Sequence, residues 1–415
     1  MVYRPKHHLT APQGRINDPN GLTLEGDELH VYFQHDPGFP HEPKRTGWGH
    51  AAMAADGVWR HYPMALHPDR VYDDEGCWSG SAVSHQGAIR IFYTGNAGAQ
   101  TQNIADAYGI GGPMGGTYRK RADNPALTIP PGYVEDFRDP HVSQAADGTW
   151  RMVVGARREN NTAAVLLYTS PDLDAWEFAG ELEFIGLNYN TASAHMWECP
   201  NLLTMWDTVA EQPREVLVFC PQFPDSEECG YVVGRLDGLR FEVLRDFTPL
   251  DYGHEFYAPQ LIPFGSGALM LGWMGLPGRD NVPTFEAEGW VHSLTLVREL
   301  SLIDASLNTS LHIPTHHDML VERFELSGEE FAAELVDSEG NVGASVHWQP
   351  DGSGRGTLSL DVDGLVRWAE CAGGTMVFVA DGAAVELTAG TGEVAFSSAV
   401  FAPGGNDWAS LRPAR

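Results

Sequence analysis

The sequence predicts an all-β protein, a five-bladed β-propeller followed by a C-terminal β-sandwich. Short runs rich in β-branched and aromatic residues recur along the chain, each ends in a turn, and long helical periodicity is absent. The 46 glycines and 27 prolines favour strands joined by turns. Runs of the same kind return roughly every 60 residues over about 300 residues, which is the repeat expected of propeller blades with ~four strands each.

Two kinds of strand signal define this repeat. The apolar runs, which we expect to form core strands, lie at residues 28–34, 88–95, 149–156, 163–170, 215–222 and 268–275. The second signal is a turn containing aspartate followed by an aromatic strand, and it lies at residues 55–63, 171–180 and 236–244. In a propeller the innermost strands converge on one central pocket, so polar residues beside those strands are the candidates for a site.

The character of the sequence changes near residues 300–318, where a polar, turn-rich stretch replaces the strand pattern. Alternating strand runs then return, among them SVHWQP, GTLSLDVDG and TMVFVADG. A second all-β unit of about 100 residues fits this pattern, most simply as a sandwich. We therefore divide the chain into a propeller domain over residues 1–305 and a sandwich domain over residues 306–415.

The composition limits the partners of the protein. With 26 basic and 56 acidic residues the net charge is −30, and such a surface repels nucleic acid and anionic membranes but not a neutral ligand. No apolar run approaches the ~20 residues of a membrane helix, and the first residues lack the apolar core of a secretory signal. The five scattered cysteines fit reduced thiols. We expect a cytoplasmic protein with a small-molecule substrate, either a monomer or a homo-oligomer.

Three acidic residues lie beside the expected inner strands in unusual local sequences. Asp18 is in NDPNG and Asp139 is in FRDP, so a proline follows each and restricts the backbone of the aspartate. Glu198 is in WECP, next to Trp197. Burial among aromatic residues favours the protonated form of a carboxyl group, which is what a general acid requires.

Each of these residues alone also has a structural explanation, since aspartate and proline are common in turns and a buried acid can be satisfied by hydrogen bonds. The combination, spread over separate blades, is typical of a sugar-cleaving site. A retaining glycosidase needs a nucleophilic carboxylate and an acid/base carboxyl about 5–5.5 Å apart, and a third carboxylate can hold sugar hydroxyls. The three acids together therefore favour a glycoside hydrolase.

The chain resembles glycoside hydrolase family 32, the β-fructofuranosidase and invertase group. Three segments are similar to the acidic motifs of that family: NDPNG (17–21), FRDP (137–140) and WECP (197–200). Further similar segments follow in the family's order: YFQHDPG (32–38), WGHA (48–51), GCWSGSAV (76–83), YTGN (93–96), DYGHEFYAPQ (251–260), GWVHSLTLVREL (289–300) and MVFVADGAAVEL (376–387). The resemblance covers nearly the whole chain and implies the same propeller and sandwich.

The resemblance implies hydrolysis at C2 of a terminal β-linked fructose with retention of configuration. It implies that Asp18 is the nucleophile, Glu198 the acid/base, and Asp139 the transition-state stabiliser, which binds fructose hydroxyls together with Arg138. The other residues that it assigns to substrate binding are Asn17, Gln34, Trp48, Trp78, Ser79, Tyr257 and Trp273. It implies no metal and no organic cofactor.

Several positions depart from the family pattern, and they concern the leaving group. Arg15 replaces an aromatic residue, Glu255 stands where aspartate is common, and no second tryptophan follows Trp273. This form resembles the bacterial cytoplasmic branch, which includes sucrose-6-phosphate hydrolases. A phosphate group would need clustered cations, and the candidates are Arg15, Lys44, Arg45, Arg119, Lys120 and Arg121. Because surface solvation also explains several of these cations, we favour sucrose or short fructo-oligosaccharides as substrates.

Alternatives stay open at this point. A sucrose-6-phosphate hydrolase, a fructosyltransferase or an exo-fructanase would use the same acids, whereas an inverting glycosidase would hold its carboxyls ~6.5–9.5 Å apart. A sugar-binding protein without catalysis is a further possibility, and the presence of all three carboxyls argues against it. Trp48 and Trp78 also fit ordinary core positions. The pairs His7–His8 and His316–His317 lack further ligands at metal-binding spacing.

Overall fold

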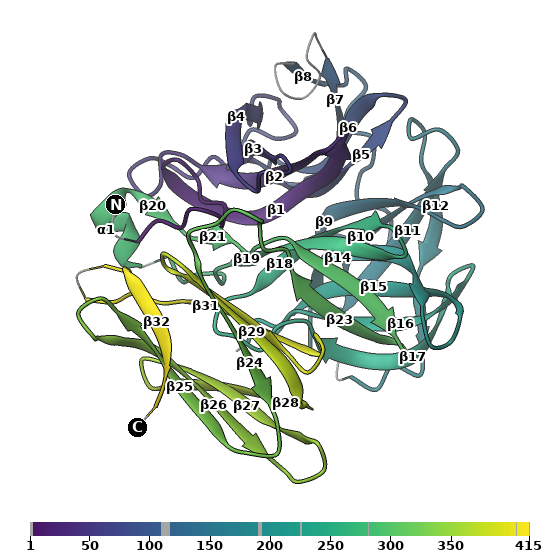
Figure 1. Cartoon of the computed structure of the whole chain (residues 1–415). Coiled ribbons are helices and arrows are strands. Elements are labelled where there is room, and N and C mark those ends of the chain that lie inside the picture. Colours follow the sequence, from purple (N-terminus) through teal and green to yellow (C-terminus); the bar gives the residue numbers. More distant parts are fainter. Residues whose placement is uncertain are drawn as a thin grey trace.

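Figure 1 shows the computed structural model, which describes residues 3–108, 117–189, 193–224, 226–280, 282–403 and 405–414. A ring of β-sheets forms the larger part of the molecule, and two further sheets lie beside it toward the C-terminus. The one helix in these ranges is the short α1 (Pro283–Glu288), and no helix there has the length and apolar character to cross a bilayer. The predicted all-β architecture of a five-bladed propeller and a sandwich is confirmed.

In each of the first three blades the chain runs outward from the innermost strand through an antiparallel sheet. The first blade contains β1 (Gly14–Glu25), β2 (Glu28–Asp36), β3 (Gly47–Met53) and β4 (Trp59–Leu66). The second contains β5 (Gly76–His85), β6 (Ala88–Asn96), β7 (Gln100–Tyr108) and β8 (Thr117–Lys120). The third contains β9 (Tyr133–Gln144), β10 (Trp150–Arg158), β11 (Ala163–Ser170) and β12 (Glu177–Glu181).

The fourth and fifth blades follow the same plan and share one pairing. The fourth contains β14 (Met196–Asp207), β15 (Gln212–Gln222), β16 (Gly230–Asp237), β17 (Arg240–Pro249) and the short β13 (Glu183–Ile185). The fifth contains β18 (Tyr257–Phe264), β19 (Gly267–Met274), β22 (Arg298–Ile303), β23 (Ser306–Leu311) and the short β21 (Ser293–Leu294). Asp207 of β14 pairs with Leu302 of β22 and so connects the two sheets.

The C-terminal part is a sandwich of two antiparallel sheets around one core that includes Trp348, Phe378 and Phe396. One sheet contains β24 (Leu320–Leu326), β29 (Gly374–Asp381), β30 (Ala384–Ala389) and β31 (Val394–Ala399). The other contains β25 (Phe331–Asp337), β26 (Val342–Pro350), β27 (Arg355–Val362), β28 (Leu365–Ala372) and β32 (Trp408–Pro413). The division of the chain at residues 305 and 306 remains a proposal, and β23 pairs with β22 of the fifth blade.

The innermost strands of the five blades form a closed ring. The strands β1, β5, β9, β14 and β18 contact one another in this order, and β18 contacts β1. The short β20 (Trp290–Val291) pairs in parallel with Gly14 and Arg15 of β1. A segment from the fifth blade thus returns to the first blade, which ties the two ends of the ring together.

A break in strand pairing occurs at the same level in all five innermost strands. The shifts lie between Ile16 and Pro19, Trp78 and Gly80, Arg138 and His141, Glu198 and Asn201, and Tyr257 and Gln260. In four strands the break contains a proline, which has no N–H for the ladder; these are Pro19, Pro140, Pro200 and Pro259. Asp139, Cys199 and Ala258, each before a proline, have φ angles of 66°, 48° and 45°. Bulges of this kind redirect side chains, here next to the predicted acids.

Polar side chains close the central channel below these breaks. The residue that follows each of the four prolines is polar: Asn20, His141, Asn201 and Gln260. Gln260 accepts a hydrogen bond from the N–H of Gly21 at 2.9 Å and donates one to Asn201 at 2.9 Å, which connects the first, fifth and fourth blades. The void among these residues is about 10 Å³, close to the size of one water molecule.

A buried charge network joins the N-terminal segment, the fifth blade and the sandwich. Nδ1 of His8 lies 2.9 Å from Asp381, and Nε2 lies 3.0 Å from Glu386. Nε of Arg298 donates to Glu386 at 3.0 Å, and Nη2 lies 2.9 Å from Asp251. Burial acts to lower the pKa of His8, but the two carboxylates outweigh it and raise the value to about 9. His8 is therefore a cation at neutral pH.

Candidate active site

The predicted site residues converge on one cavity near the centre of the propeller. The cavity has a volume of about 260 Å³ and is lined by Arg15, Asn17, Asp18, Gln34, Lys44, Trp78, Asp136, Arg138, Asp139, Glu198, Tyr257, Trp273 and Pro277. Nine of the eleven residues predicted for the site line this cavity, and Trp48 and Ser79 do not. Residues far apart in the sequence, from all five blades, therefore share one pocket.

Asp18 in β1 is held by donors on both of its carboxyl oxygens. Oδ1 accepts a hydrogen bond from Nδ2 of Asn17 at 3.0 Å. Oδ2 accepts from Oγ of Ser79 at 2.5 Å and from Nε2 of Gln34 at 3.2 Å. Burial raises the pKa of Asp18, the hydrogen bonds from Ser79 and Asn17 oppose this rise, and the nearby Glu198 adds to it. The carboxyl group is thus fixed in orientation at the wall of the cavity.

Glu198 in β14 has polar rather than aromatic surroundings. Nη2 of Arg138 donates to Oε1 at 2.8 Å, and the hydroxyl of Tyr257 donates to Oε2 at 2.8 Å. The ring of Trp197 instead stacks on Phe219 in the core, with centroids 4.2 Å apart. The prediction that Trp197 surrounds Glu198 is therefore wrong, because successive side chains of a strand face opposite sides. Nε of Arg138 also donates to Oε1 at 3.3 Å, so both carboxyl oxygens are bound and the group is held in place.

Asp139 in β9 connects the other two acids through Cys199. The N–H of Cys199 donates to Oδ2 of Asp139 at 3.0 Å, and Sγ of Cys199 lies 3.8 Å from Oδ2 of Asp18. Cys199 is also the residue that follows Glu198, so the three acids meet around one backbone position. Burial raises the pKa of Asp139 to about 7; Arg138 opposes the rise, and the neighbouring carboxylates add to it. Asp139 can therefore hold a proton close to neutral pH.

Arg138 binds Asp136 and Glu198 more closely than the adjacent Asp139. Its guanidinium binds Asp136 and Glu198, whereas Nε lies 3.9 Å from Oδ2 of Asp139. Nη2 also donates to the side-chain oxygen of Gln222 at 3.1 Å. Burial acts to lower the pKa of Arg138, but the surrounding carboxylates raise it overall. Arg138 is a permanent cation among the acids of the cavity.

Trp48 and Ser79 support the cavity from behind. Oγ of Ser79 accepts a hydrogen bond from Nε2 of Gln34 at 2.5 Å while it donates to Asp18. Trp48 is fully buried in the core, and its Nε1 donates to the backbone carbonyl of Trp78 at 3.0 Å. Trp48 is thus a core residue that fixes the position of Trp78, whose side chain lines the cavity, and it does not itself reach the pocket.

Four lining residues were not predicted to bind substrate: Arg15, Lys44, Asp136 and Pro277. Asp136 lies in the same EDFRDP segment as Asp139, and this proximity is the one sequence signal that could have identified it. In the structure it has a φ angle of 72°. Arg15 and Lys44 are two of the cations considered above for a phosphate group, and Arg15 also departs from the family pattern. The buried side chain of Arg15 reaches Asp280, a residue that is remote in sequence and gave no signal.

Most of the cations considered for a phosphate group lie away from the cavity. Lys120 binds Asp69 at 2.8 Å and Asp73 at 2.6 Å. Arg121 pairs with Asp123 at 2.7 Å. Of the six candidates, only two line the cavity, and they are Arg15 and Lys44. Glu255 does not line it either, and accepts a hydrogen bond from the N–H of Ala399 in the sandwich at 2.9 Å.

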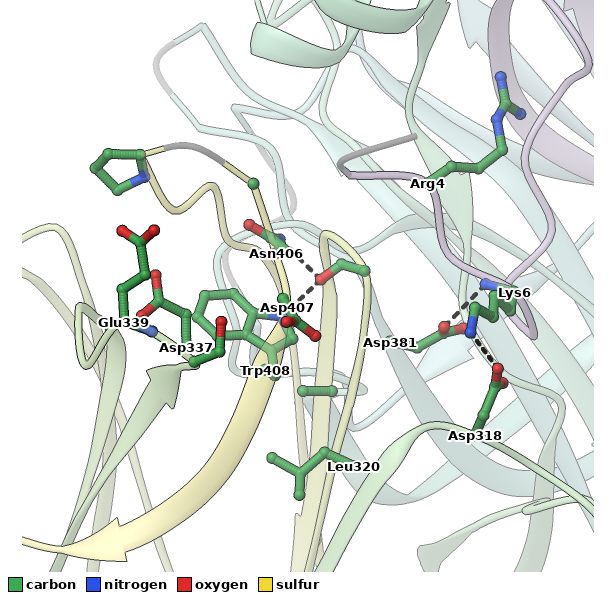
Figure 2. Close-up of a pocket in the computed structure, with 15 residues that line it drawn as sticks. Arg4, Lys6, Asp318, Leu320, Asp337, Glu339, Asp381, Asn406, Asp407 and Trp408 are labelled. Carbon is green, nitrogen blue, oxygen red and sulfur yellow. Dashed lines mark hydrogen bonds and ion pairs between the residues drawn. The ribbon is translucent and has the colours of Figure 1, made fainter.

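A larger cavity of about 480 Å³ lies between the N-terminal segment and the sandwich, as Figure 2 shows. It contains many acidic side chains, but these stabilise local structure. Asp381 accepts from the N–H of Lys6 at 2.8 Å, and Asp337 accepts from the N–H groups of Glu339 at 2.9 Å and Asn341 at 2.8 Å. None of the predicted site residues lines this cavity, so volume alone does not identify the site.

The smaller cavity has the groups that glycoside hydrolysis requires. Asp18, Asp139 and Glu198 line the same cavity, and each has a different environment. Different environments allow neighbouring carboxyl groups to take different roles in glycoside hydrolysis. Within the described ranges, no group of three or more histidine, cysteine, aspartate and glutamate side chains is arranged to hold a metal ion.

Comparisons with known proteins agree with this chemistry. The family model for the glycosyl hydrolases family 32 N-terminal domain matches residues 8–312. The chain is similar to the sucrose-6-phosphate hydrolase of Klebsiella pneumoniae, with 38% identity over 316 residues, which are 71% of this chain and 64% of that protein. It is also similar to the raffinose invertase of Escherichia coli, with 33% identity over 320 residues, 74% of this chain and 64% of that protein. The match spans less than two thirds of the length of these curated relatives.

Solved structures match nearly the whole chain. The family 32 β-fructofuranosidase of Bombyx mori superimposes with a TM-score of 0.80 at 29% identity, covering 99% of this chain and 91% of that chain. A mutant of the same enzyme, solved in complex with sucrose, gives a TM-score of 0.79. The sucrose-6-phosphate hydrolase of Lactobacillus gasseri has a TM-score of 0.83 at 24% identity, covers 100% of this chain and 91% of that chain, and supports the fold alone.

Proposed function

The chain belongs to glycoside hydrolase family 32, and from this premise we propose that it is a retaining β-fructofuranosidase. It removes the terminal β-linked fructose of sucrose or a short fructo-oligosaccharide through a covalent fructosyl-enzyme intermediate. The observation that supports this most strongly is the convergence of Asp18, Asp139 and Glu198 from three inner strands on one cavity of about 260 Å³. A cavity of this size suits an enzyme that removes one terminal sugar at a time.

In the first half of the reaction, Asp18 attacks C2 of the fructose while Glu198 protonates the glycosidic oxygen. The bond between C2 and that oxygen breaks as the bond from C2 to the Asp18 carboxylate forms. The proton of Glu198 leaves with the aglycone. Arg138 and Tyr257, which donate to the two oxygens of Glu198, stabilise the carboxylate that remains.

In the second half, Glu198 takes a proton from a water molecule that attacks C2, and Asp18 is released as a carboxylate. Asp139 binds fructose hydroxyls and faces the positive charge that develops on the ring. Asn17, Gln34, Trp78, Tyr257 and Trp273 line the pocket and contact the bound sugar. No step of this reaction requires a metal or an organic cofactor.

A second candidate function is hydrolysis of sucrose 6-phosphate. Arg15 and Lys44 both line the cavity, and two cations at its wall favour a leaving group that bears an anion. Several similar proteins are named as sucrose-6-phosphate hydrolases. Arg15, however, is already engaged by Asp280 at 2.6 Å, which leaves Lys44 as the exposed cation. We therefore retain unphosphorylated sucrose and short fructo-oligosaccharides as the first candidates.

A substrate panel tests both candidates. The purified protein is incubated with sucrose, sucrose 6-phosphate, 1-kestose, inulin and levan, and released fructose is quantified. We expect release from sucrose and 1-kestose, and none from sucrose in Asp18→Asn or Glu198→Gln. Absence of fructose from every substrate would overturn the proposal, and an inverted anomer in early product NMR spectra would overturn the retaining mechanism. A ratio of kcat/KM that strongly favours sucrose 6-phosphate would select the second candidate.

The partners and location follow the same proposal. The protein needs a small fructoside as its substrate and neither nucleic acid nor a membrane, which the net charge of −30 favours. We also propose a cytoplasmic location. The products of the panel measured at high sucrose concentration would show how much fructose is transferred to sugar acceptors, because transfer and hydrolysis share the fructosyl-enzyme intermediate.

A further inference from the structure

A chain of hydrogen bonds leads from the fifth-blade side of the cavity to Asp18. Nε2 of His292 lies 3.1 Å from Oδ1 of Asp280. The same oxygen accepts from Nε of Arg15 at 2.6 Å, and Nη1 of Arg15 donates to Oδ1 of Asn17 at 3.1 Å. Nδ2 of Asn17 then donates to Oδ1 of Asp18 at 3.0 Å. Four consecutive contacts thus connect His292 with the candidate nucleophile.

Arg15 is held in this chain from several directions. Its side chain is 9% exposed, so the guanidinium is almost removed from solvent. The guanidinium carbon lies 5.2 Å from the ring centroid of Trp273, and the imidazole of His292 packs edge-on against the same ring at 5.2 Å. His292 has a φ angle of 66°, a strained backbone state that surrounding contacts must maintain. An arginine restrained in this way has one orientation to offer to Asn17.

We propose that Arg15 is a positioning residue that orients the amide of Asn17 and thereby fixes the carboxyl group of Asp18 for attack. This inference rests on the proposed role of Asp18 as nucleophile. It goes beyond that role because it assigns a task to a residue that lies outside the acidic motifs.

The argument begins with the two ends of the Asn17 amide. Nδ2 has two N–H groups, and they donate to Asp18 at 3.0 Å and to Oε1 of Gln34 at 2.8 Å. Nη1 of Arg15 donates to the oxygen end, and an amide flipped by 180° would present Nδ2 to a guanidinium that cannot accept. The flipped amide would also turn its oxygen toward the carboxylate of Asp18 and toward Oε1 of Gln34. Arg15 therefore holds the oxygen end of the amide in the orientation in which Asn17 donates to the nucleophile.

The electrostatics act in the same direction. Burial raises the pKa of Asp18, and both the hydrogen bond from Asn17 and the charge of Arg15 lower it. The other ionisable groups that face Asp18 are Glu198, Asp139 and the thiol of Cys199. Those around the Arg15 end of the chain are Asp280, His292 and Lys44. Arg15 donates its hydrogen bonds to Asp280 and Asn17 rather than to Glu198, the acid/base candidate. Its charge can therefore be removed without changing a direct partner of Glu198.

The test compares Arg15→Met with Arg15→Lys and Arg279→Met. Methionine keeps the length of the stem that packs on Trp273 and removes the guanidinium, and lysine restores a charge without the forked donors. Arg279 is exposed, adjoins Asp280 in sequence and does not line the cavity, so its substitution removes a nearby charge as a matched control. The carboxyl carbon of Asp18 is followed by NMR in protein labelled at aspartate with carbon-13, and Asp18→Asn assigns its signal.

We expect the titration midpoint of Asp18 to rise by about 0.5 pH unit or more in Arg15→Met, by less in Arg15→Lys, and not at all in Arg279→Met. Unchanged midpoints in both Arg15 variants would overturn the inference, and Arg15→Lys alone decides if the methionine variant does not fold. This measurement needs no turnover, so inactivity of the wild type toward every fructoside would contradict the proposed function without deciding the role of Arg15.

Kinetics provide the second readout. The acid limb of the kcat/KM profile should move upward by a similar amount in Arg15→Met, with kcat reduced about tenfold and KM little changed. The reduction in kcat of Arg15→Met should be the same on sucrose and on sucrose 6-phosphate if both are substrates. A loss confined to the phosphorylated substrate would overturn the positioning role and make Arg15 a contact for the leaving group instead.

Discussion

Nη2 of Arg138 donates to Oε1 of Glu198 at 2.8 Å, and the same guanidinium binds Asp136. One buried cation therefore connects the acid/base candidate in the fourth blade with the wall of the cavity in the third blade. A planar guanidinium holds a carboxylate in a defined orientation, which an ammonium group does not. The position of Glu198 relative to the substrate consequently depends on a residue 60 positions away in the chain.

Removing either reacting carboxyl should abolish turnover without unfolding the protein. We expect Asp18→Asn and Glu198→Gln to lower kcat by at least about a thousandfold, because each step needs both groups. The thermal midpoint should stay at or above that of the wild type, since an uncharged amide is easier to bury. Steady-state kinetics on sucrose and calorimetry check this. Activity within about tenfold of the wild type in either variant would remove that residue from the proposed mechanism.

Replacing Arg138 by lysine should reduce kcat more than it changes KM. Lysine keeps the charge but cannot bind Glu198 and Asp136 in the same fork, so the acid/base carboxyl loses its fixed orientation. A loss of about tenfold or more in kcat on sucrose is expected. Arg157→Lys is the matched control, since Arg157 binds Asp136 at 2.9 Å but does not line the cavity. Equal effects of the two substitutions would show that Arg138 acts only through Asp136.

Asp139→Asn should make the protein more stable above pH 7 while it lowers activity. Burial raises the folded-state pKa of Asp139 to about 7, above its ordinary value of 3.8. Ionisation of the buried group therefore opposes folding, and this penalty grows as pH rises from about 4 to 7 and is complete above pH 7. We expect the variant and the wild type to unfold alike near pH 4, and the variant to gain at least about 1 kcal/mol at pH 8.

Calorimetry or urea unfolding at pH 4 and pH 8 measures this difference. Asp147→Asn is the control, because Asp147 is an exposed turn residue whose pKa is lowered by the N–H of Thr149. A wild type that is more stable than Asp139→Asn at pH 8 would contradict the prediction.

The contacts of His8 with Asp381 and Glu386 should make stability fall in alkaline solution. The folded-state pKa of His8 is about 9 and its ordinary value is 6.5, so the stabilisation is complete below pH 6.5 and is lost as pH rises through 9. A shift of this size corresponds to about 3 kcal/mol or slightly more. The free energy of unfolding of the wild type should therefore decrease between pH 6.5 and pH 9.5, and His8→Gln should lack this decrease. His347→Gln, on the exposed side of the sandwich, should keep it.

The apolar runs identified from the sequence correspond to strands of the blades other than the innermost ones. They coincide with β2, β6, β10, β11, β15 and β19, and these strands are recognisable because nearly all their central residues are buried. The innermost strands have no such run, since they contain polar side chains at the pocket and a break in pairing. Three of them, β1, β9 and β14, are indicated by their acidic motifs, and β5 and β18 only by segments that resemble the family.

A repeated proline marks four of the inner strands in the sequence. DPN, DPH, CPN and APQ occupy equivalent places in four inner strands, at the breaks in pairing. The motif places a residue without an N–H where the ladder is interrupted, followed by a polar side chain that bonds to the next blade. A search for this pattern would have aligned the inner strands and pointed to Ala258 as the fifth-blade equivalent of Asp139 and Cys199.

The sequence by itself determined the repeat of strands, the class of fold and the three acids, because strand periodicity and proline restrict the backbone locally. The tertiary structure decided what surrounds each acid. It placed Trp48 in the core, gave Glu198 the guanidinium of Arg138 and the hydroxyl of Tyr257 in place of Trp197, and joined Arg15 to Asp280, 265 residues away. The charge and orientation of a carboxyl group depend on the atoms within a few ångströms of it, and closure of the ring brings those atoms from distant blades.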